Sequence, residues 1–98
     1  MARVELAAEV AEDFDRIFDH LAQHDVQGAP SHIQDIMAAI DVLERNPLIG
    51  RRAGTHHREL IIGRRSHAYV ALYRYSPELD TVFIVAIRSQ SEAGYARE

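Results

Sequence analysis

The chain has 98 residues, which is enough for one domain built around one hydrophobic core. No apolar stretch approaches the roughly 18 residues that a membrane helix needs, and the first residues show no signal-peptide pattern. The absence of cysteine excludes disulfides and thiolate metal sites. We therefore expect one cytoplasmic domain over residues 1–98, away from the membrane.

The charge is distributed unevenly along the chain. A net charge of −4 argues against a general nucleic-acid binder. Residues 1–50 carry ten acidic residues and three arginines, whereas residues 51–98 carry eight arginines and five acidic residues. This asymmetry predicts an acidic scaffold face and a basic working face. The basic side chains other than histidine are all arginines, whose guanidinium groups suit bidentate contacts with phosphate or carboxylate.

The first half predicts a strand followed by two helices. Apolar and polar residues alternate over residues 2–6, which is the period of a half-buried strand. Apolar residues then recur at helical spacing over residues 8–24 and 31–46. The second helix begins either with a capping box at residues 31–34 or with Pro30 at its first position. The residues expected in the core are Val10, Phe14, Ile17, Leu21, Ile33, Ile36, Ile40 and Leu43. The polar face of the first helix is expected to contain Glu12, Asp13, Asp15, Arg16 and Asp19.

The second half predicts a sheet. A loop through residues 50–54 precedes three strand-like runs, at residues 57–63, 67–75 and 81–88. The predicted fold class is therefore α+β, in the order β-α-α-β-β-β. We expect an antiparallel sheet that the first strand rejoins, with an N-terminal helical hairpin packed on one face.

The last two predicted strands are apolar on both faces. One parity of residues 67–75 contains Tyr69, Tyr73 and Tyr75, and the other parity is aliphatic. Because two short helices cover only one side of a sheet, we expect a partner to cover the second side, with its tyrosines. The alternative is that the C-terminal tail or a dimer mate covers it.

The sequence contains no clear catalytic or metal motif. His20 and His24 have the spacing of zinc ligands without a third ligand nearby, so solvated histidines are expected, and no metal or cofactor is predicted. There is no nucleophile elbow and no phosphate-binding loop. What remains is a set of arginines and tyrosines that can form a basic, aromatic-lined surface for bases or an acidic peptide. Its members are Arg58, Arg64, Arg65, Arg74, Arg88, Tyr69, Tyr73, Tyr75 and Tyr95.

Three blocks of the chain, at residues 58–63, 69–75 and 82–95, resemble the RelE/ParE superfamily of bacterial type II toxins. The N-terminal half agrees, because a strand and two amphipathic helices lead through Asn46-Pro47 and Gly50-Arg51 to the sheet. The resemblance covers essentially the whole chain and rests on the order of elements. It implies a toxin that its cognate antitoxin neutralises by wrapping the sheet and helices, in a toxin–antitoxin hetero-oligomer.

The superfamily contains two mechanisms. RelE-type members cleave mRNA on the ribosome with basic side chains and often a C-terminal tyrosine, whereas ParE-type members lack that set and poison DNA gyrase. In this chain Ser89 and Ser91 occupy positions where many relatives have histidine and a second arginine. Serine supplies neither a charge nor a proton near neutral pH, as phosphodiester cleavage requires.

We therefore favour a ParE-like poison of DNA gyrase, without a catalytic site. Its antitoxin- or target-binding residues would be Arg58, Arg64, Arg65, Tyr69, Tyr73, Arg74, Tyr75 and Arg88. The first alternative is a RelE-type mRNA endonuclease, whose catalytic residues would be Arg64, Arg65, Arg74, Arg88 and Tyr95. The second alternative is a protein-interaction module without toxicity.

Overall fold

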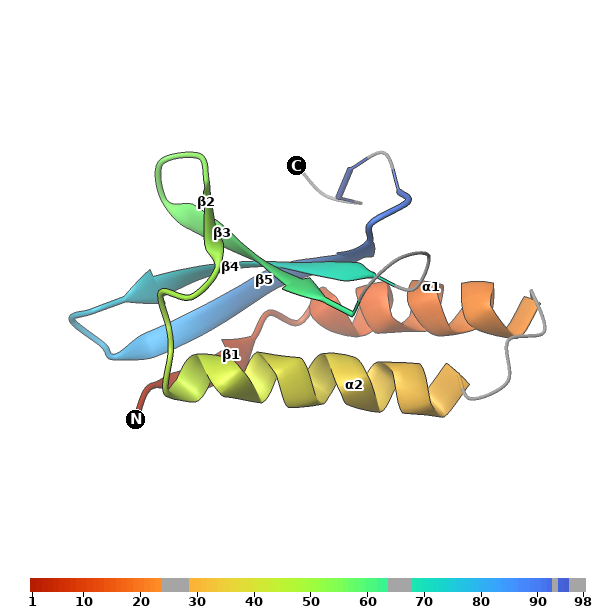
Figure 1. Ribbon diagram of the computed structural model, residues 1–98, viewed down its shortest axis with the longest axis horizontal. Helices are drawn as coiled ribbons and strands as arrows, with labels where there is room; N and C mark the ends of the chain where they lie inside the picture. The colour runs from red at the N-terminus through yellow and green to blue at the C-terminus, as the bar shows by residue number, and fades with distance from the viewer. Residues whose placement is uncertain (24–28, 64–67, 93, 96–98) are drawn as a thin grey trace.

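The computed structural model describes residues 1–23, 29–63, 68–92 and 94–95 (Figure 1). Over these residues the chain combines helices with one sheet, which confirms the predicted α+β class. The helices are α1 (Val10–Gln23), α2 (Ala29–Asp41) and the short 3₁₀ helix η1 (Val42–Glu44). The strands are β1 (Arg3–Leu6), β2 (Arg51–Ala53), β3 (His57–Ile62), β4 (Tyr69–Ser76) and β5 (Thr81–Ser89).

The sheet is mixed, in the order β1-β5-β4-β3-β2. Strands β3, β4 and β5 pair antiparallel, but β1 pairs parallel with β5, which corrects the predicted all-antiparallel sheet. The physical reason is the connection: the chain leaves β1 directly into α1 and passes through both helices before it returns, so no hairpin turn joins the two strands.

A further strand, β2, forms where only a loop was predicted. Gly54 adopts a φ of +80°, a left-handed conformation that glycine tolerates, and the chain turns back there. Residues 51–53 thereby pair antiparallel with residues 57–59 of β3. Figure 1 shows this β2–β3 hairpin rising on the side of the sheet opposite to the helices.

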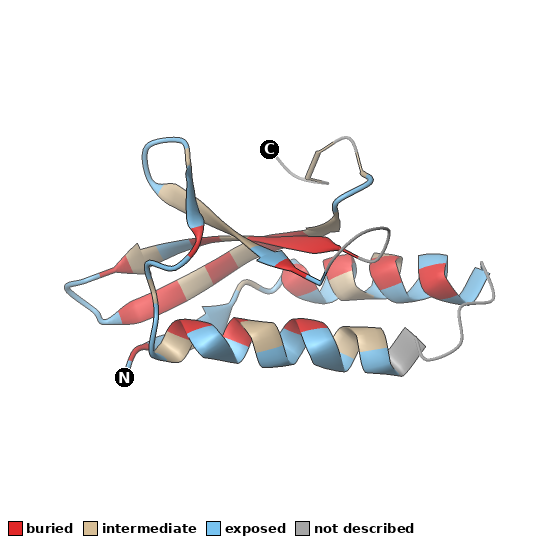
Figure 2. Cartoon of the chain, in the orientation of Figure 1, coloured by how far each residue is buried: buried red, intermediate tan, exposed pale blue. Residues whose placement is uncertain are grey.

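Helices α1 and α2 lie on one side of the sheet, which we call the helix face (Figure 1). Figure 2 shows that each helix turns its buried stripe toward the sheet and its exposed side away. Of the predicted core residues, Phe14 and Ile33 are partly buried and the other six are buried. Helix α2 begins at Ala29, so Ser31 lies inside its first turn and does not cap it. In the described residues, neither helix is long and apolar enough to cross a membrane.

Asp13 lies in the protein interior, although its charge predicts the solvent side of α1. Only 1% of its surface is exposed. One carboxylate oxygen accepts a hydrogen bond of 3.0 Å from the backbone N–H of Ile87, and the other accepts one of 2.9 Å from Arg16. The Arg16 guanidinium also donates to the Ile87 carbonyl at 3.0 Å. Backbone pairing of β5 with β1 ends at Ile84. Beyond that point, Asp13 and Arg16 of α1 bind the backbone N–H and carbonyl of Ile87, which would otherwise be unpaired at the sheet edge.

Two of the predicted surface tyrosines belong to the core. Tyr69 and Tyr73 are 6% and 0% exposed and pack on the helix face with the apolar residues of α1 and α2. The Tyr73 hydroxyl accepts a hydrogen bond of 2.8 Å from Gly50 N–H, and the Tyr69 hydroxyl lies 3.3 Å from His32 Nδ1. The assignment of these tyrosines to a partner-covered second face is therefore wrong. Their hydroxyls have polar partners inside the fold, which offsets the cost of removing these hydroxyls from water.

Candidate functional site

The side of the sheet opposite to the helices, which we call the open face, is crossed by the C-terminal tail. The Tyr95 hydroxyl donates a 2.7 Å hydrogen bond to the Glu59 carboxylate on β3, and the Tyr95 ring lies 5.0 Å from the Arg88 guanidinium on β5. Strand β4 runs between β3 and β5, so Tyr95 bridges two strands that are not neighbours. Val70 of β4, which lies between Arg88 and Ile61 in register, is fully buried.

The predicted tail alternative therefore holds for this part of the open face. The tail is held at a second point by Glu92. Its carboxylate accepts hydrogen bonds of 3.0 Å from Arg16 Nε and 2.7 Å from the backbone N–H of Ser89. Arg16 thus joins α1 to the strand end through Asp13 and to the tail through Glu92. Burial alone would lower the pKa of Arg16, but its contacts with Asp13 and Glu92 raise it, so this side chain stays charged.

Arg88 is occupied by the tail that it supports. Its Nη1 donates toward the carbonyl oxygens of Ser89, Gln90 and Glu92 at 3.2, 3.4 and 3.3 Å, while Nε is buried without a hydrogen-bond partner. The guanidinium is thereby folded around its own strand end and stacked beneath Tyr95. A cation in this position stabilises the tail conformation through cation–π and hydrogen-bond contacts.

The protonation of Tyr95 and Glu59 is fixed by their contact. Burial and the hydrogen bond to Glu59 raise the pKa of the Tyr95 hydroxyl well above its ordinary value of 10.0. The same hydrogen bond lowers the pKa of Glu59, and Arg51 adds to that effect with a contact of 3.0 Å. At neutral pH the pair is therefore a neutral phenol donating to a carboxylate. This contact disfavours the tyrosine as a general base, because it would have to lose its proton next to a negative charge.

The other predicted site residues do not converge on this cluster. Arg74 is exposed and stacks on Phe83, with 4.8 Å between its guanidinium carbon and the ring centre. Arg74 lies four positions along β4 from Val70, the register partner of Arg88, which corresponds to roughly 13 Å along a strand. Arg74 and Arg88 therefore occupy different parts of the open face.

Three further predicted residues lie elsewhere. Tyr75 is on the helix face and donates a 2.7 Å hydrogen bond to Asp80, which raises the pKa of its hydroxyl. Arg58, the register partner of Tyr73, donates to the carbonyl oxygens of Leu48 and Gly50. Arg64 and Arg65 lie outside the described residues, so their predicted roles stay predictions.

Sequence reasoning missed Glu59, Arg51, Arg16 and Glu92 as residues that organise this region. Arg51 and Glu59 face each other in the β2–β3 register and form an ion pair. Recognising β2 as a strand would have placed them opposite each other. The link between Arg16 and Glu92 spans 76 positions in the sequence, and no local pattern indicates it.

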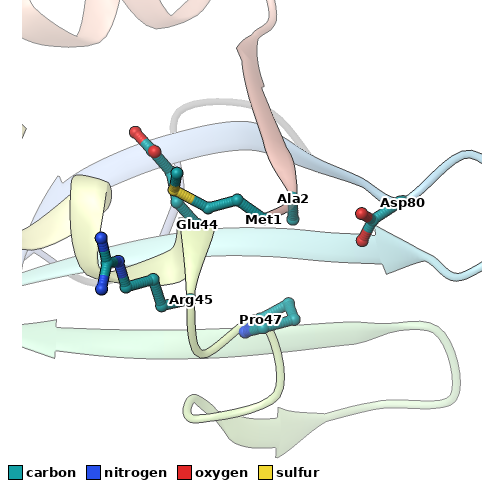
Figure 3. Close-up of a pocket in the computed structure, with 6 residues that line it drawn as sticks. All are labelled: Met1, Ala2, Glu44, Arg45, Pro47 and Asp80. Carbon is teal, nitrogen blue, oxygen red and sulfur yellow. The ribbon is translucent and has the colours of Figure 1, made fainter.

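A separate pocket of about 460 Å³ lies at the base of the molecule, where the N-terminus meets the segment after α2. Figure 3 shows Glu44 and Arg45 on one side of it and Asp80 on the other, with Met1 and Ala2 between them. Pro47 completes its lining. The six lining residues include two acidic side chains but no pairing of a nucleophile with a base, so we assign no catalytic role to this pocket.

Residues 4–94 match the model of a family described as the ParE toxin of type II toxin–antitoxin systems, parDE. A solved structure described as the chromosomal ParDE TA system from P. aeruginosa has a similar fold, with a TM-score of 0.73. It is 24% identical in sequence, and the similarity covers 91% of this chain and 96% of that chain. No curated protein matches the sequence.

Proposed function

The chain belongs to the ParE toxin family of type II toxin–antitoxin systems, and on that premise we propose that it poisons DNA gyrase without cutting RNA. We further propose that a cognate antitoxin neutralises it in a hetero-oligomer and that it acts in the cytoplasm. Gyrase as the target is supported by the ParE-like resemblance of the sequence. The absence of nuclease activity is supported by the chemistry of the tail.

The observation that carries this proposal is the hydrogen bond of 2.7 Å from Tyr95 to Glu59. A ribonuclease of the RelE type needs a group that removes the proton of the 2′-hydroxyl and a free cation that stabilises the scissile phosphate. In this chain the tyrosine is held in its neutral form, and Arg88 is engaged with tail carbonyls. Ser89 and Ser91 bind each other at 2.9 Å and carry no charge.

The remaining open face supports an antitoxin site. Ile61 is 40% exposed there, and Leu72 and Phe83 are partly buried beside the exposed Arg74. We propose that an antitoxin segment covers these apolar side chains and places an acidic residue on Arg74. Arg64 and Arg65 stay proposed members of the same surface. A stable complex of this kind is expected to bury more than about 1,000 Å².

The substitution Tyr95→Phe tests the non-catalytic assignment. It keeps the ring over Arg88 and removes only the hydroxyl, so the variant is expected to arrest growth as strongly as the wild type when it is expressed without antitoxin. Removing a general acid or base costs about 10²–10⁴-fold in rate, so a catalytic hydroxyl would make the variant harmless. The measurement is colony formation on induction, with thermal melting as a check that both proteins fold. A folded variant without toxicity would contradict the assignment.

A further inference from the structure

Residues 45–58 form the most basic segment of the chain. They contain four arginines, two histidines and no acidic residue, in a protein with 15 acidic residues in total. The segment runs from the end of η1 through β2 to the first residues of β3, and its β2 part is the edge strand farthest from β1. Arg51 of this segment forms an ion pair with Glu59, the residue that binds Tyr95 of the C-terminal tail. The proposed function assigns no role to the rest of the segment.

Two aliphatic side chains are exposed in the middle of this segment. Leu48 and Ile49 are adjacent in sequence, and 58% and 57% of their surfaces are exposed. Single exposed hydrophobic residues are common on protein surfaces, but an adjacent exposed pair within a basic segment is a candidate for an interaction site.

The backbone under this pair is held rigidly. Gly50 N–H donates to the buried hydroxyl of Tyr73 at 2.8 Å, and Arg58 Nη1 donates to the carbonyl oxygens of Leu48 and Gly50 at 3.2 and 2.8 Å. Ile49 N–H also donates to the Asn46 carbonyl at 3.1 Å. The Leu48–Ile49, Ile49–Gly50 and Gly50–Arg51 peptide groups therefore each take part in a hydrogen bond. A surface that is ordered before binding loses little conformational entropy when a partner arrives.

Arg51 pairs with Glu59, but two other arginines of the segment lack acidic partners within the described part of the chain. Arg45 and Arg52 are exposed and form no ion pair there. Arg52 also lies directly opposite Arg58 in the β2–β3 register. Like charges in that position destabilise a sheet, and a negatively charged partner would relieve the repulsion.

We propose that residues 45–58 are the docking surface for an acidic segment of the target protein that also carries aliphatic side chains. The arginines of the segment would bind acidic side chains of a partner, and Leu48 and Ile49 would pack against its apolar side chains. A protein segment meets both needs, whereas nucleic acid would leave the aliphatic side chains without stacking or hydrogen-bond partners. This proposal rests on the proposed function, under which the target is gyrase.

Two variants and two matched controls test the surface. The variants are Arg52→Glu and the double substitution of Leu48 and Ile49 by serine. The controls are Arg3→Glu, on the edge strand β1 at the other side of the sheet, and Leu79→Ser, which is 65% exposed in the turn between β4 and β5. For each protein we would measure the concentration that half-inhibits gyrase supercoiling, the affinity for the purified cognate antitoxin, and binding to a DNA duplex of about 20 base pairs.

Both variants are expected to require at least about 10-fold more protein for half-inhibition, which corresponds to about 1.4 kcal/mol of binding free energy. Their affinity for the antitoxin should stay within about twofold of the wild type, and both controls should inhibit like the wild type. Inhibition by the variants at wild-type concentrations would overturn the proposal. An equal loss of antitoxin affinity, or duplex binding that the variants lose, would also overturn it, because the surface would then serve the antitoxin or DNA.

Failure of the proposed function is distinguishable from failure of this inference. If the wild type does not inhibit gyrase, gyrase is not the target, and growth arrest in cells replaces supercoiling as the readout. Variants that fold and bind the antitoxin but no longer arrest growth would then support the docking surface for another target protein. Variants that arrest growth like the wild type would refute it.

Discussion

Replacing Asp13 by alanine is expected to lower the free energy of unfolding by about 1–3 kcal/mol, the usual cost of leaving a buried hydrogen-bond donor without its acceptor. The carboxylate is 1% exposed, and it accepts hydrogen bonds from Ile87 N–H and from Arg16. Its loss leaves a strand N–H unpaired in the interior and removes one of the two carboxylates that neutralise Arg16. Urea denaturation of the isolated chain measures the change.

Two controls show whether the effect comes from the buried contact. Asp13→Asn keeps an acceptor for Ile87 N–H but removes the charge, so it should destabilise less than alanine does. Asp15→Ala removes an exposed carboxylate two residues away and is expected to change stability by less than about 0.5 kcal/mol. Equal stability of Asp13→Ala and Asp15→Ala would contradict the role assigned to Asp13 as the link between α1 and the β5 edge.

The substitution Gly50→Ala is expected to destabilise the protein by about 3 kcal/mol, through steric overlap and a lost buried hydrogen bond. A Cβ at this position would lie 2.6 Å from the Tyr73 hydroxyl oxygen and 2.8 Å from the Glu59 carbonyl oxygen. The second of these atoms belongs to the backbone of β3, so it cannot move aside without distorting the sheet. The Tyr73 hydroxyl would also have to move away from Gly50 N–H.

Gly54→Ala is the matched control for this prediction. Gly54 has a φ of +80°, but no atom lies within 4 Å of a Cβ built there, so the cost is limited to backbone strain of about 1–2 kcal/mol. Thermal melting of both variants measures the difference. A Gly50→Ala protein that is more stable than Gly54→Ala would contradict the close packing of Gly50 against Tyr73.

The helices and their core residues could be predicted because their apolar periodicity is strong. Val10, Ile17, Leu21, Ile36 and Ile40 recur at helical spacing, and all five are buried against the sheet. Asp13 breaks this rule, since a carboxylate one turn from Val10 and Ile17 reads as a solvent-facing residue. Its burial depends on the β5 edge, which is 74 positions away in the sequence, and helical periodicity carries no information about that partner.

The faces of the central strands could not be assigned from alternation. Both parities of β4 are largely apolar, so the pattern does not show which side meets the helices. The tyrosine parity faces the helices, where Gly50 and His32 lie within hydrogen-bond reach of the Tyr73 and Tyr69 hydroxyls. The pairing register of β4 with β5 also shifts between Leu72 and Tyr73. A prediction from simple alternation assumes one continuous register and does not include such a shift.

The candidate site was predicted in part from chemistry rather than from geometry. Ser89 and Ser91 were enough to favour a toxin without nuclease chemistry, because their side chains supply no charge and no readily transferred proton. The sequence did not indicate that Tyr95 reaches Glu59 or that Arg88 binds the carbonyl groups of its own tail. Both contacts follow from the fold of the tail over β4, and they turn two proposed catalytic residues into parts of a structural cluster.

The most direct test of the proposed mechanism uses the purified wild-type chain in two assays at the same concentrations. One measures supercoiling by DNA gyrase, and the other measures cleavage of ribosome-bound mRNA. We predict inhibited supercoiling, with accumulation of cleaved DNA, and intact message, because Tyr95 stays protonated against Glu59 and Arg88 is bound to the carbonyl groups of its own tail. Codon-positioned cuts in the mRNA with undisturbed supercoiling would contradict this mechanism and assign the chain to the RelE type.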